Sequence, residues 1–440
     1  MNTKPKGTYD ILPEEVGKWQ KLEDLIRKVC KLYNYQEIRT PIFESFDVFH
    51  RDQNDSSDMV TKETYDFLDR SDRKITLRPE GTAGVIRAYI ENKLYVSNPV
   101  SKLYYLGPMF RYERPQKGRY RQFHQFGIEA IGSKSPLIDV ETIALAKSIL
   151  SGLGITDIKV KINSLGDSES RENYKKVLVN YFSNYQDCMC EDCKTRLQKN
   201  PLRILDCKID RGQDFFIKAP KIKDYLNEGS KNRFNEVLKA LDGLNINYEV
   251  DDNLVRGLDY YSHTVFEIEA NITELGNQNV LCAGGRYDSL VKDLGGPDTP
   301  GIGLAFGIER LLIATDLIGK KLNKLENNHV YLITLGPKAQ LEGFKILNTL
   351  RLGGLRCEMD YLNGSLKSQF KKADNLNSLF TCILGDEELE NFKINIKDNT
   401  TDVQETIGLY DVYKYVLNKL MANNKCAKCK ESGDKNETND

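Results

Sequence analysis

Apolar side chains recur at helical spacing near the start of the chain. Residues 13–32 open with proline and place an apolar residue at every third or fourth position, which predicts an amphipathic helix. The run that follows, residues 35–43, predicts a strand that stops or bends at Pro41. Residues 75–82 predict a second strand, which runs into a helix that starts near Gly81.

Residues 109–129 predict two strands joined by a loop, because the Pro-Gln-Lys-Gly sequence at 115–118 is typical of a turn and both flanks are rich in aromatic residues. Side chains alternate between the two faces of a strand, so one face gathers charged, amide and aromatic groups. These groups are Met109, Arg111, Glu113, Arg121, Phe123, Gln125 and Glu129, with Gly127 leaving room among them. Such a surface is costly to bury without a ligand and predicts a binding site; the alternative is the solvated face of an ordinary hairpin.

The hydrophobic pattern from residue 168 onwards indicates how the chain is divided into domains. Residues 168–250 are helical and charged and surround a group of cysteines, which predicts an inserted helical subdomain, whereas 264–269 and 280–283 predict strands. Past residue 328, strands alternate with helices, as in a separate α/β domain. We therefore expect a first domain over 1–325, a second over 326–422 and a disordered, charged tail over 423–440.

Charge is nearly balanced, with 63 Lys and Arg against 64 Asp and Glu, so no overall field attracts nucleic acid. The local basic cluster in the hairpin loop is the candidate for contacting a polyanion. The first residues lack the apolar centre of a secretory signal, and no apolar run approaches the ~20 residues that span a bilayer. Ten cysteines in such a chain indicate reduced thiols, and we expect a cytoplasmic protein with no membrane partner.

A lone arginine, Arg256, lies between apolar residues and a glycine in the segment 254–261. An arginine in this setting keeps its charge and must find an anion or carbonyl groups. It is therefore a candidate ligand-binding residue; the alternative is a structural pair with Asp259. Two adjacent tyrosines, Tyr260 and Tyr261, follow it.

Two glycine-rich segments come later. In residues 282–288, paired glycines after a strand allow a ligand to approach the backbone, although such a pair is most often only a turn. Residues 300–312 run from small residues into an apolar helix with Arg310 in its first turn. Backbone amides and an arginine at a helix N-terminus favour phosphate binding, and an ordinary surface charge is the alternative.

Together these motifs resemble the histidyl-tRNA synthetases, a family of class II aminoacyl-tRNA synthetases. Three stretches resemble the three class II motifs in order: residues 35–41, 110–129 and 301–312. In the family, the first of these motifs builds the dimer interface. Two histidine-specific signatures are also present: Leu254-Val-Arg-Gly-Leu-Asp-Tyr-Tyr and Ala283-Gly-Gly-Arg-Tyr-Asp. The resemblance extends over nearly the whole chain. It implies an α+β fold with an antiparallel catalytic sheet flanked by helices, a helical insertion and a C-terminal α/β anticodon-binding domain.

The resemblance also implies an activity. The family joins histidine to ATP, giving histidyl-adenylate and pyrophosphate, and then transfers histidine to the 3′-terminal adenosine of tRNA(His). It implies Mg²⁺ beside ATP, a homodimer, and the catalytic residues Arg111, Arg256 and Arg310. Arg111 would hold the α-phosphate and the histidine carboxylate, and Arg310 the γ-phosphate. Arg256 would face Arg111 across the α-phosphate, where related enzymes use a metal ion, while Glu113 and Phe123 would contact adenine.

Further roles follow from the resemblance. Histidine would be bound by Glu80, Gly81, Thr82, Arg111, Gln125, Glu129, Arg256, Tyr260 and Tyr261. The acceptor end of the tRNA would be met by Arg114, Gln116, Lys117 and Arg119. We set His124 and His263 aside as catalytic bases, since His124 falls on the rear face of its strand.

The cysteines of the inserted segment have spacings compatible with zinc: Cys188, Cys190, Cys193 and Cys207. Zinc is not a general feature of the family, and we favour reduced, packed thiols over a metal site. Cys426 and Cys429 in the tail have no second pair nearby. In the C-terminal domain, Gly364 stands where the family often carries an arginine, which affects the expected anticodon contacts.

A non-catalytic relative that binds histidine or uncharged tRNA is the competing hypothesis, and a structural scaffold is a third. Such relatives lose the phosphate-contacting arginines or the C-terminal domain. This chain keeps both the three arginines and the C-terminal domain, which favours an active ligase.

Overall fold

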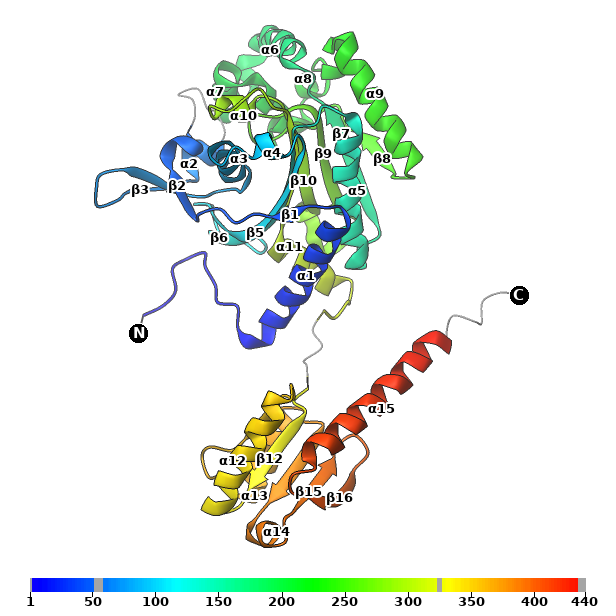
Figure 1. The fold of residues 1–440 in the computed structure, drawn as a ribbon. Helices are drawn as coiled ribbons and strands as arrows, with labels where there is room; N and C mark the ends of the chain where they lie inside the picture. The colour runs from blue at the N-terminus through cyan, green and yellow to red at the C-terminus, as the bar shows by residue number, and fades with distance from the viewer. Residues whose placement is uncertain (1, 51–57, 323–326, 434–440) are drawn as a thin grey trace. The chain divides into compact units, whose positions relative to one another are not determined.

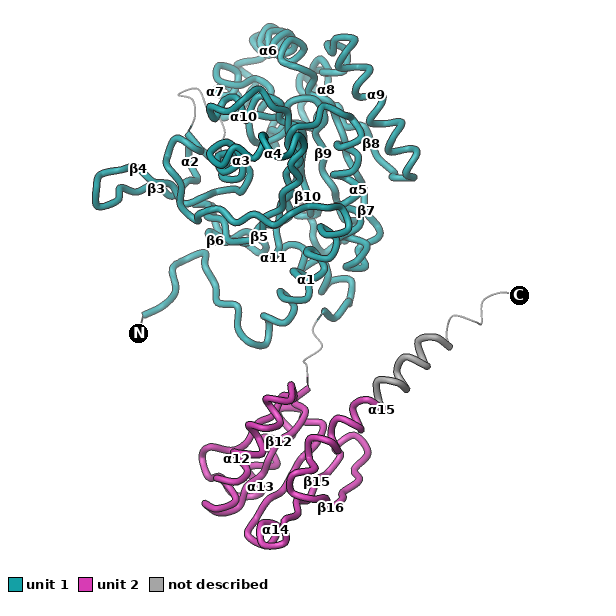
Figure 2. Tube along the Cα trace, in the orientation of Figure 1, with its two compact units in different colours: residues 1–323 teal, residues 324–440 magenta. Residues whose placement is uncertain are grey.

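The computed structural model describes residues 2–50, 58–322 and 327–433, and these form two compact units (Figure 2). The first unit covers residues 1–323 and the second 324–440. Each is described by itself below. None of the helices in the described part of the chain has the length and apolar character that spanning a membrane requires.

The first unit is built on an eight-stranded sheet with the strand order β1-β5-β6-β11-β10-β9-β7-β8 (Figure 1). The six inner strands pair antiparallel, whereas β1 and β8 at the two edges pair parallel with their neighbours. The predicted antiparallel sheet is thus confirmed. The strands are β1 (Gln36–Glu37), β5 (Ser101–Phe110), β6 (Gln122–Ile131), β7 (Ile158–Ser164), β8 (Tyr248–Val250), β9 (Ser262–Ala270), β10 (Val280–Tyr287) and β11 (Gly301–Gly307).

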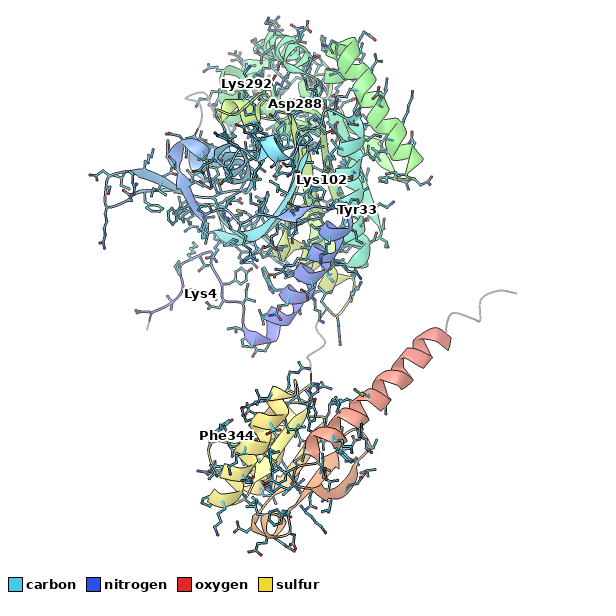
Figure 3. The ribbon with its side chains drawn as sticks, in the orientation of Figure 1. Lys4, Tyr33, Lys102, Asp288, Lys292 and Phe344 are labelled. Carbon is cyan, nitrogen blue, oxygen red and sulfur yellow. The ribbon has the colours of Figure 1, made fainter. Side chains whose placement is uncertain are left out.

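Four helices pack on one face of this sheet and share its main core: α1 (Pro13–Leu32), α5 (Pro136–Gly152), α9 (Glu228–Gly243) and α11 (Ile308–Leu317). The helix predicted over residues 13–32 is confirmed, and its residues Trp19, Leu22 and Ile26 are buried. Near the end of α1, Lys102 of β5 lies beside Tyr33 (Figure 3), and its ammonium group donates to the Tyr33 carbonyl at 3.4 Å.

The other face of the sheet meets α3 (Thr82–Glu91) and α10 (Leu290–Asp293) around a smaller core. Residues Leu103 and Tyr105 of β5 belong to this core, whereas Tyr104 belongs to the main one, as the period of two along a strand requires. The short helices α2 (Asp58–Lys62) and α4 (Leu94–Ser97) complete this side.

A small three-stranded sheet has the order β2-β4-β3. Its strands are β2 (Phe43–Ser45), β3 (Tyr65–Leu68) and β4 (Lys74–Leu77). The predicted strand over residues 35–43 is therefore two short strands, β1 and β2, in different sheets, because Pro41 interrupts it. The strand-to-helix transition near Gly81 is confirmed, since β4 leads to α3 with Gly81 as its N-cap.

The predicted hairpin is formed by β5 and β6, with Met109 opposite Phe123 and Gly107 opposite Gln125. One difference concerns its first strand, which ends at Phe110, so that Arg111 and Glu113 follow the strand instead of belonging to it. Pro115 has no N–H to give to a ladder, and the turn closes through a bridge between Gln116 and Arg119.

The inserted segment contains α6 (Ser168–Phe182), α7 (Glu191–Lys199), α8 (Asp214–Ile217) and the 3₁₀ helices η2 (Ser183–Cys188), η3 (Pro201–Asp206), η4 (Asp210–Gly212) and η5 (Ile222–Tyr225). These pack around a core of their own. The segment 228–250 behaves differently, since α9 contributes Val237 and Leu241 to the main core and β8 pairs with β7. The limits we gave the insertion, 168–250, stay a prediction.

The second unit is a five-stranded sheet with the order β13-β12-β14-β15-β16. Its strands are β12 (Val330–Thr334), β13 (Cys357–Met359), β14 (Phe380–Leu384), β15 (Lys393–Asp398) and β16 (Val403–Gly408). Its helices are α12 (Pro337–Leu352), α13 (Leu366–Asn375), α14 (Asp386–Glu390) and α15 (Val412–Gly433). The predicted α/β alternation is confirmed, and α14 and β16 are additions to it.

Two sequence interpretations need correction here. The paired glycines of residues 282–288 lie within β10 and do not form a turn after a strand. The last helix, α15, continues to Gly433, beyond the predicted start of the disordered tail at residue 423, and residues 422–432 contain neither glycine nor proline. The prediction of a disordered tail stays untested for residues 434–440, which lie outside the described residues, as do the side chains of Cys426 and Cys429.

Candidate active site

A cavity of about 440 Å³ lies against the second face of the large sheet. It brings together most of the residues singled out from the sequence: Glu80, Thr82, Arg111, Glu113, Arg119, Phe123, Gln125, Glu129, Arg256, Tyr260, Tyr261 and Arg310. Gly81 of the proposed histidine site and Arg114, Gln116 and Lys117 of the loop are not among its lining residues. The three arginines come from three distant stretches of the chain, yet all of them face one cavity.

Arg256 is held at this cavity by a carboxylate from a neighbouring strand. Its Nη1 lies 2.5 Å from Oε1 of Glu267 on β9, and its guanidinium lies 5.6 Å from the centre of the Tyr261 ring. The alternative pair with Asp259 is wrong, because Asp259 accepts a hydrogen bond from Asn200 at 2.6 Å instead. Burial raises the pKa of Glu267, although Arg256 opposes the shift.

Arg310 lies in the first turn of α11, as the sequence predicted. Its Nη1 donates to the Val280 carbonyl at 2.7 Å. Burial, together with the positive charges of Arg119 and Arg111, lowers its pKa. Arg310 is thus no ordinary surface charge: it stands in a group of cations that an anion would stabilise.

Arg111 follows the first strand of the hairpin and turns back into the cavity. Its Nε donates to the Pro79 carbonyl at 2.8 Å, and its guanidinium lies 5.2 Å from the centre of the Phe123 ring. Glu113 lies near both neighbouring cations, with its carboxylate 3.9 Å from Arg111 and 3.5 Å from Arg119. The half-buried ring of Phe123 and these polar groups suit a flat, nitrogen-containing ring.

Several buried polar atoms at the cavity have no hydrogen-bond partner among the described residues: Nε of Arg256, Nε of Arg310 and Oε1 of Gln125. Buried polar groups are nearly always hydrogen-bonded in folded proteins. These atoms therefore indicate a polar ligand that carries both an anionic group and a hydrogen-bond donor.

Carboxylates dominate one end of the cavity. Glu129 accepts hydrogen bonds from the hydroxyl groups of Thr82, at 2.7 Å, and Tyr287, at 2.5 Å. Burial raises the pKa of Glu129 to about 8, against the lowering effect of these two hydroxyl groups. Glu80 accepts from the backbone N–H groups of Thr82 and Ala83 at 2.7 and 2.9 Å and so caps the N-terminus of α3.

Glycines in the sheet leave space for this end of the cavity. A Cβ atom at Gly303 would overlap the Glu129 carboxylate, and one at Gly285 would lie 2.8 Å from the Tyr261 ring. Gly81 has a structural role of the same kind, because a Cβ there would overlap the ring of Tyr105. The backbone approaches side chains of the site closely at each of these positions, which only glycine allows.

Sequence reasoning missed Tyr105, Glu267 and Tyr287 as residues of the site, and all three line the cavity or anchor Arg256. Tyr105 could have been found from the sequence, because the alternation of side chains along β5 places it on the same face as Met109. Glu267 and Tyr287 depend on which strands become neighbours in the sheet, and a local pattern does not give that information.

The histidines that we set aside as bases are engaged elsewhere. His124 packs edge-on against Trp19, and its Nδ1 lies 3.1 Å from Glu309. His263 lies 3.6 Å from Asp288, and burial lowers its pKa. Neither residue lines the cavity.

Two family models match this chain. A family model described as "Histidyl-tRNA synthetase" matches residues 7–166 and 206–311, more than half of the chain. A second, described as "Anticodon binding domain", matches residues 329–419.

Individual relatives are similar over almost the full length. The chain is 51% identical over 417 residues to a histidine–tRNA ligase of Staphylococcus haemolyticus, covering 94% of this chain and 99% of the relative. It is 51% identical over 415 residues to that of Bacillus subtilis, covering 94% and 97%.

Solved structures match as well. The apo histidyl-tRNA synthetase of S. aureus superimposes with a TM-score of 0.82 at 44% identity, covering 94% of this chain and all of that one. A chain from Bacillus halodurans described as an ATP phosphoribosyltransferase regulatory subunit/histidyl-tRNA synthetase shares the fold, with a TM-score of 0.63 at 23% identity over 87% of this chain and 98% of that one. With matches in sequence, domain order and structure, this chain belongs to the histidyl-tRNA synthetase family.

Proposed function

We propose that this protein is an ATP-dependent ligase that joins histidine to tRNA(His) in two steps. Histidine and ATP first give histidyl-adenylate and pyrophosphate, and the histidyl group then passes to the 3′-terminal adenosine of the tRNA. The observation that carries the proposal is the convergence of Arg111, Arg256 and Arg310 on one cavity with a carboxylate-lined end.

The arginines would act on the triphosphate. Arg111 and Arg256 would hold the α-phosphate from two sides while the histidine carboxylate attacks it, and Arg310 would hold the γ-phosphate. The pentavalent state spreads negative charge over oxygens that a planar, permanently charged guanidinium can reach. Because Glu267 and the Pro79 and Val280 carbonyls already fix these side chains, little reorganisation is needed when that charge develops.

The other end of the cavity would select histidine. Glu129, with Gln125 and Thr82 around it, offers acceptors to the substrate's ammonium and imidazole N–H groups, and Tyr260 and Tyr261 would flank the ring. A site that is built to hydrogen-bond a substrate's polar atoms rejects apolar isosteres strongly, since its own buried groups would be left without partners.

The nucleotide and its metal complete the site. Phe123 would stack on adenine and Glu113 would accept from its amino group. Mg²⁺ would accompany ATP and would offset negative charge on the phosphate oxygens, which are the kind of ligand that this ion prefers.

Contacts with tRNA would come from two places. The hairpin loop with Arg114, Gln116, Lys117 and Arg119 would approach the acceptor end, where cations position phosphates and Gln116 is a candidate base reader. The second unit, which the anticodon-binding family model matches, would contact the anticodon.

A homodimer in the cytoplasm is part of this proposal. The small sheet offers an apolar face for it, since Phe43 and Phe67 are 55% and 45% exposed and lie on the same face as Ile75 and Leu77. Exposed apolar patches of this kind mark protein contacts. Sedimentation of the purified protein should give twice the chain mass, and a species of single-chain mass at micromolar concentration would argue against it.

The decisive test of the proposed roles is charging of tRNA(His) with labelled histidine by an Arg256→Ala variant. We expect charging and histidine-dependent ATP–pyrophosphate exchange to fall by about 10²–10³-fold, as for the loss of one preorganised charge. The matched control is Arg27→Ala, since Arg27 pairs with Glu23 on the surface of α1, away from the cavity. Equal activity of the two variants would contradict the assignment of Arg256.

A further inference from the structure

Three thiols and a carboxylate meet in the inserted segment, outside the active-site cavity. The ligand atoms of Cys190, Cys193, Cys207 and Asp210 all lie within 4.8 Å of one another. Cys190 immediately precedes α7, Cys193 lies in its first turn, Cys207 follows η3 and Asp210 begins η4. Cys188, which the sequence spacing had included in this group, is exposed and does not belong to it.

The spacing of the sulfur atoms suits a bound ion. The Sγ atoms of Cys190 and Cys207 are 3.7 Å apart. Two thiolates bound tetrahedrally at about 2.3 Å from Zn²⁺ would be about 3.8 Å apart. A disulfide would need about 2.05 Å between the same atoms.

Three of the four residues, Cys190, Cys207 and Asp210, are linked to one another by hydrogen bonds from the backbone. Asp210 accepts from the Cys190 N–H at 3.1 Å, and the Asp210 N–H donates to the Cys207 sulfur at 3.3 Å. Such hydrogen bonds to ligand atoms fix their direction, as outer partners do in metal sites.

The charge of this cluster calls for a cation. Asp210, Cys193 and Cys207 are 3%, 0% and 3% exposed. A carboxylate that is shielded from water is costly unless a cation or hydrogen bonds offset its charge. A metal ion that binds thiols takes the place of their protons. None of the four groups is itself a cation.

We propose that Cys190, Cys193, Cys207 and Asp210 bind a structural Zn²⁺ ion. The donor set supplies four ligands, three of them soft sulfurs, and so leaves no open position for catalysis. The competing interpretation is the one favoured by sequence alone, reduced thiols that merely pack.

The ion would stabilise a segment that supports the active site. Between Cys193 and Cys207 lie Asn200, which donates to Asp259 at 2.6 Å, and Arg203, which donates to the Gly257 carbonyl. Both acceptors follow Arg256 in the loop that also carries Tyr260 and Tyr261. Zinc would thus act by positioning this loop.

The test is the metal content of the full chain, purified without chelator from zinc-replete cells. We expect about one zinc per chain, as for a closed structural site. Removal of zinc and addition of Co²⁺ should give thiolate-to-cobalt charge transfer and the visible bands of a tetrahedral ion. Histidine-dependent exchange should fall on zinc removal and return when Zn²⁺ is added back.

Variants locate the ligands. Cys193→Ser and Asp210→Asn should lose most of the zinc, whereas Asp210→Cys should keep it with shifted cobalt bands. The matched control, Cys188→Ser, removes an exposed thiol two residues from Cys190 and should keep a full complement. Wild-type protein that holds no zinc and gives no thiolate-to-cobalt band would overturn the proposal, and so would loss of zinc in Cys188→Ser.

Discussion

At the scale of single residues, the candidate site is defined by cations that lack full sets of partners. Arg256 and Arg310 are each anchored through one nitrogen, while their buried Nε atoms have no partner among the described residues. Buried charges of this kind are costly until an anion completes their hydrogen bonding. A bound triphosphate would supply that anion, and bidentate contacts to its oxygens suit guanidinium groups.

Glu129 leads to a prediction about pH. The pKa of Glu129 in the folded protein, about 8, lies above the ordinary carboxyl pKa of 4.5. Between pH 4.5 and pH 8 the Glu129 carboxyl group therefore keeps its proton, and its ionisation costs free energy. A histidine ammonium needs the ionised form, so binding must expel this proton below pH 8. The Kd for histidine, measured calorimetrically without ATP, should fall by up to about tenfold per pH unit between pH ~6.5 and ~8 and then level off.

The matched variants for this measurement are Glu129→Gln and Glu91→Gln. The first should bind histidine weakly and lose the slope, because an amide does not titrate. The second changes an exposed carboxylate at the end of α3 and should behave as wild type. A wild-type Kd that does not change across this range would show that Glu129 does not titrate on binding.

Some contacts of the site residues could be predicted from the sequence, and others could not. The shared face of Phe123 and Glu129 followed from alternation along β6, since the period of two is local. Arg111 reaches the same cavity from beyond the end of β5, so alternation alone does not place it. The ion-pair partner of Arg256 could not be predicted from a local pattern. Asp259 is the nearest acidic residue in the sequence, but Glu267 on β9 is the one that contacts Arg256. Pairing between strands is non-local, and a single sequence contains no direct record of it.

At the scale of elements, the patterns that predicted helices and strands were those with strong apolar periodicity. The helix over residues 13–32 and the alternation past residue 328 were confirmed for this reason. In the second unit, the two elements that the sequence did not predict are weakly patterned: α14 is short and acidic, and β16 is an edge strand whose residues are largely exposed. Edge strands bury little, and so their alternation is faint.

Packing between β11 and β6 gives a prediction at this scale. Gly303 lies opposite Glu129 in the sheet, and a Cβ there would overlap the Glu129 carboxylate and lie 2.7 Å from the Ile128 carbonyl. Gly303→Ala should therefore displace Glu129, raise the KM for histidine about tenfold or more and cost ~1–3 kcal/mol of stability.

Steady-state exchange kinetics and thermal unfolding check this expectation. The control is Gly243→Ala at the end of α9, where an added Cβ would meet no atom within 4 Å. If Gly303→Ala keeps the wild-type KM for histidine, Glu129 does not contact this substrate in the way we propose.

At the scale of the whole molecule, the chain divides into two units that each have a core. All residues that line the candidate active site belong to the first unit, and the anticodon-binding match belongs to the second. The two activities of the proposed ligase should therefore be separable, because a domain with its own core can fold alone.

A truncated chain that ends at Asn323 tests this separation. It should keep histidine-dependent ATP–pyrophosphate exchange within about tenfold of the full chain, while charging of tRNA(His) falls by on the order of a hundredfold, since anticodon contacts contribute binding free energy. Circular dichroism and thermal unfolding confirm that the truncated chain is folded. Equal loss of both activities in a folded truncation would contradict separable roles.

The histidine specificity of the proposed ligase is tested by ATP–pyrophosphate exchange with the full-length wild-type protein, with each standard amino acid offered in turn. We expect exchange with histidine alone, because the carboxylate-lined end of the cavity offers acceptors to both an ammonium group and the imidazole N–H groups. Exchange supported by another amino acid, or no exchange with any of them, would contradict it.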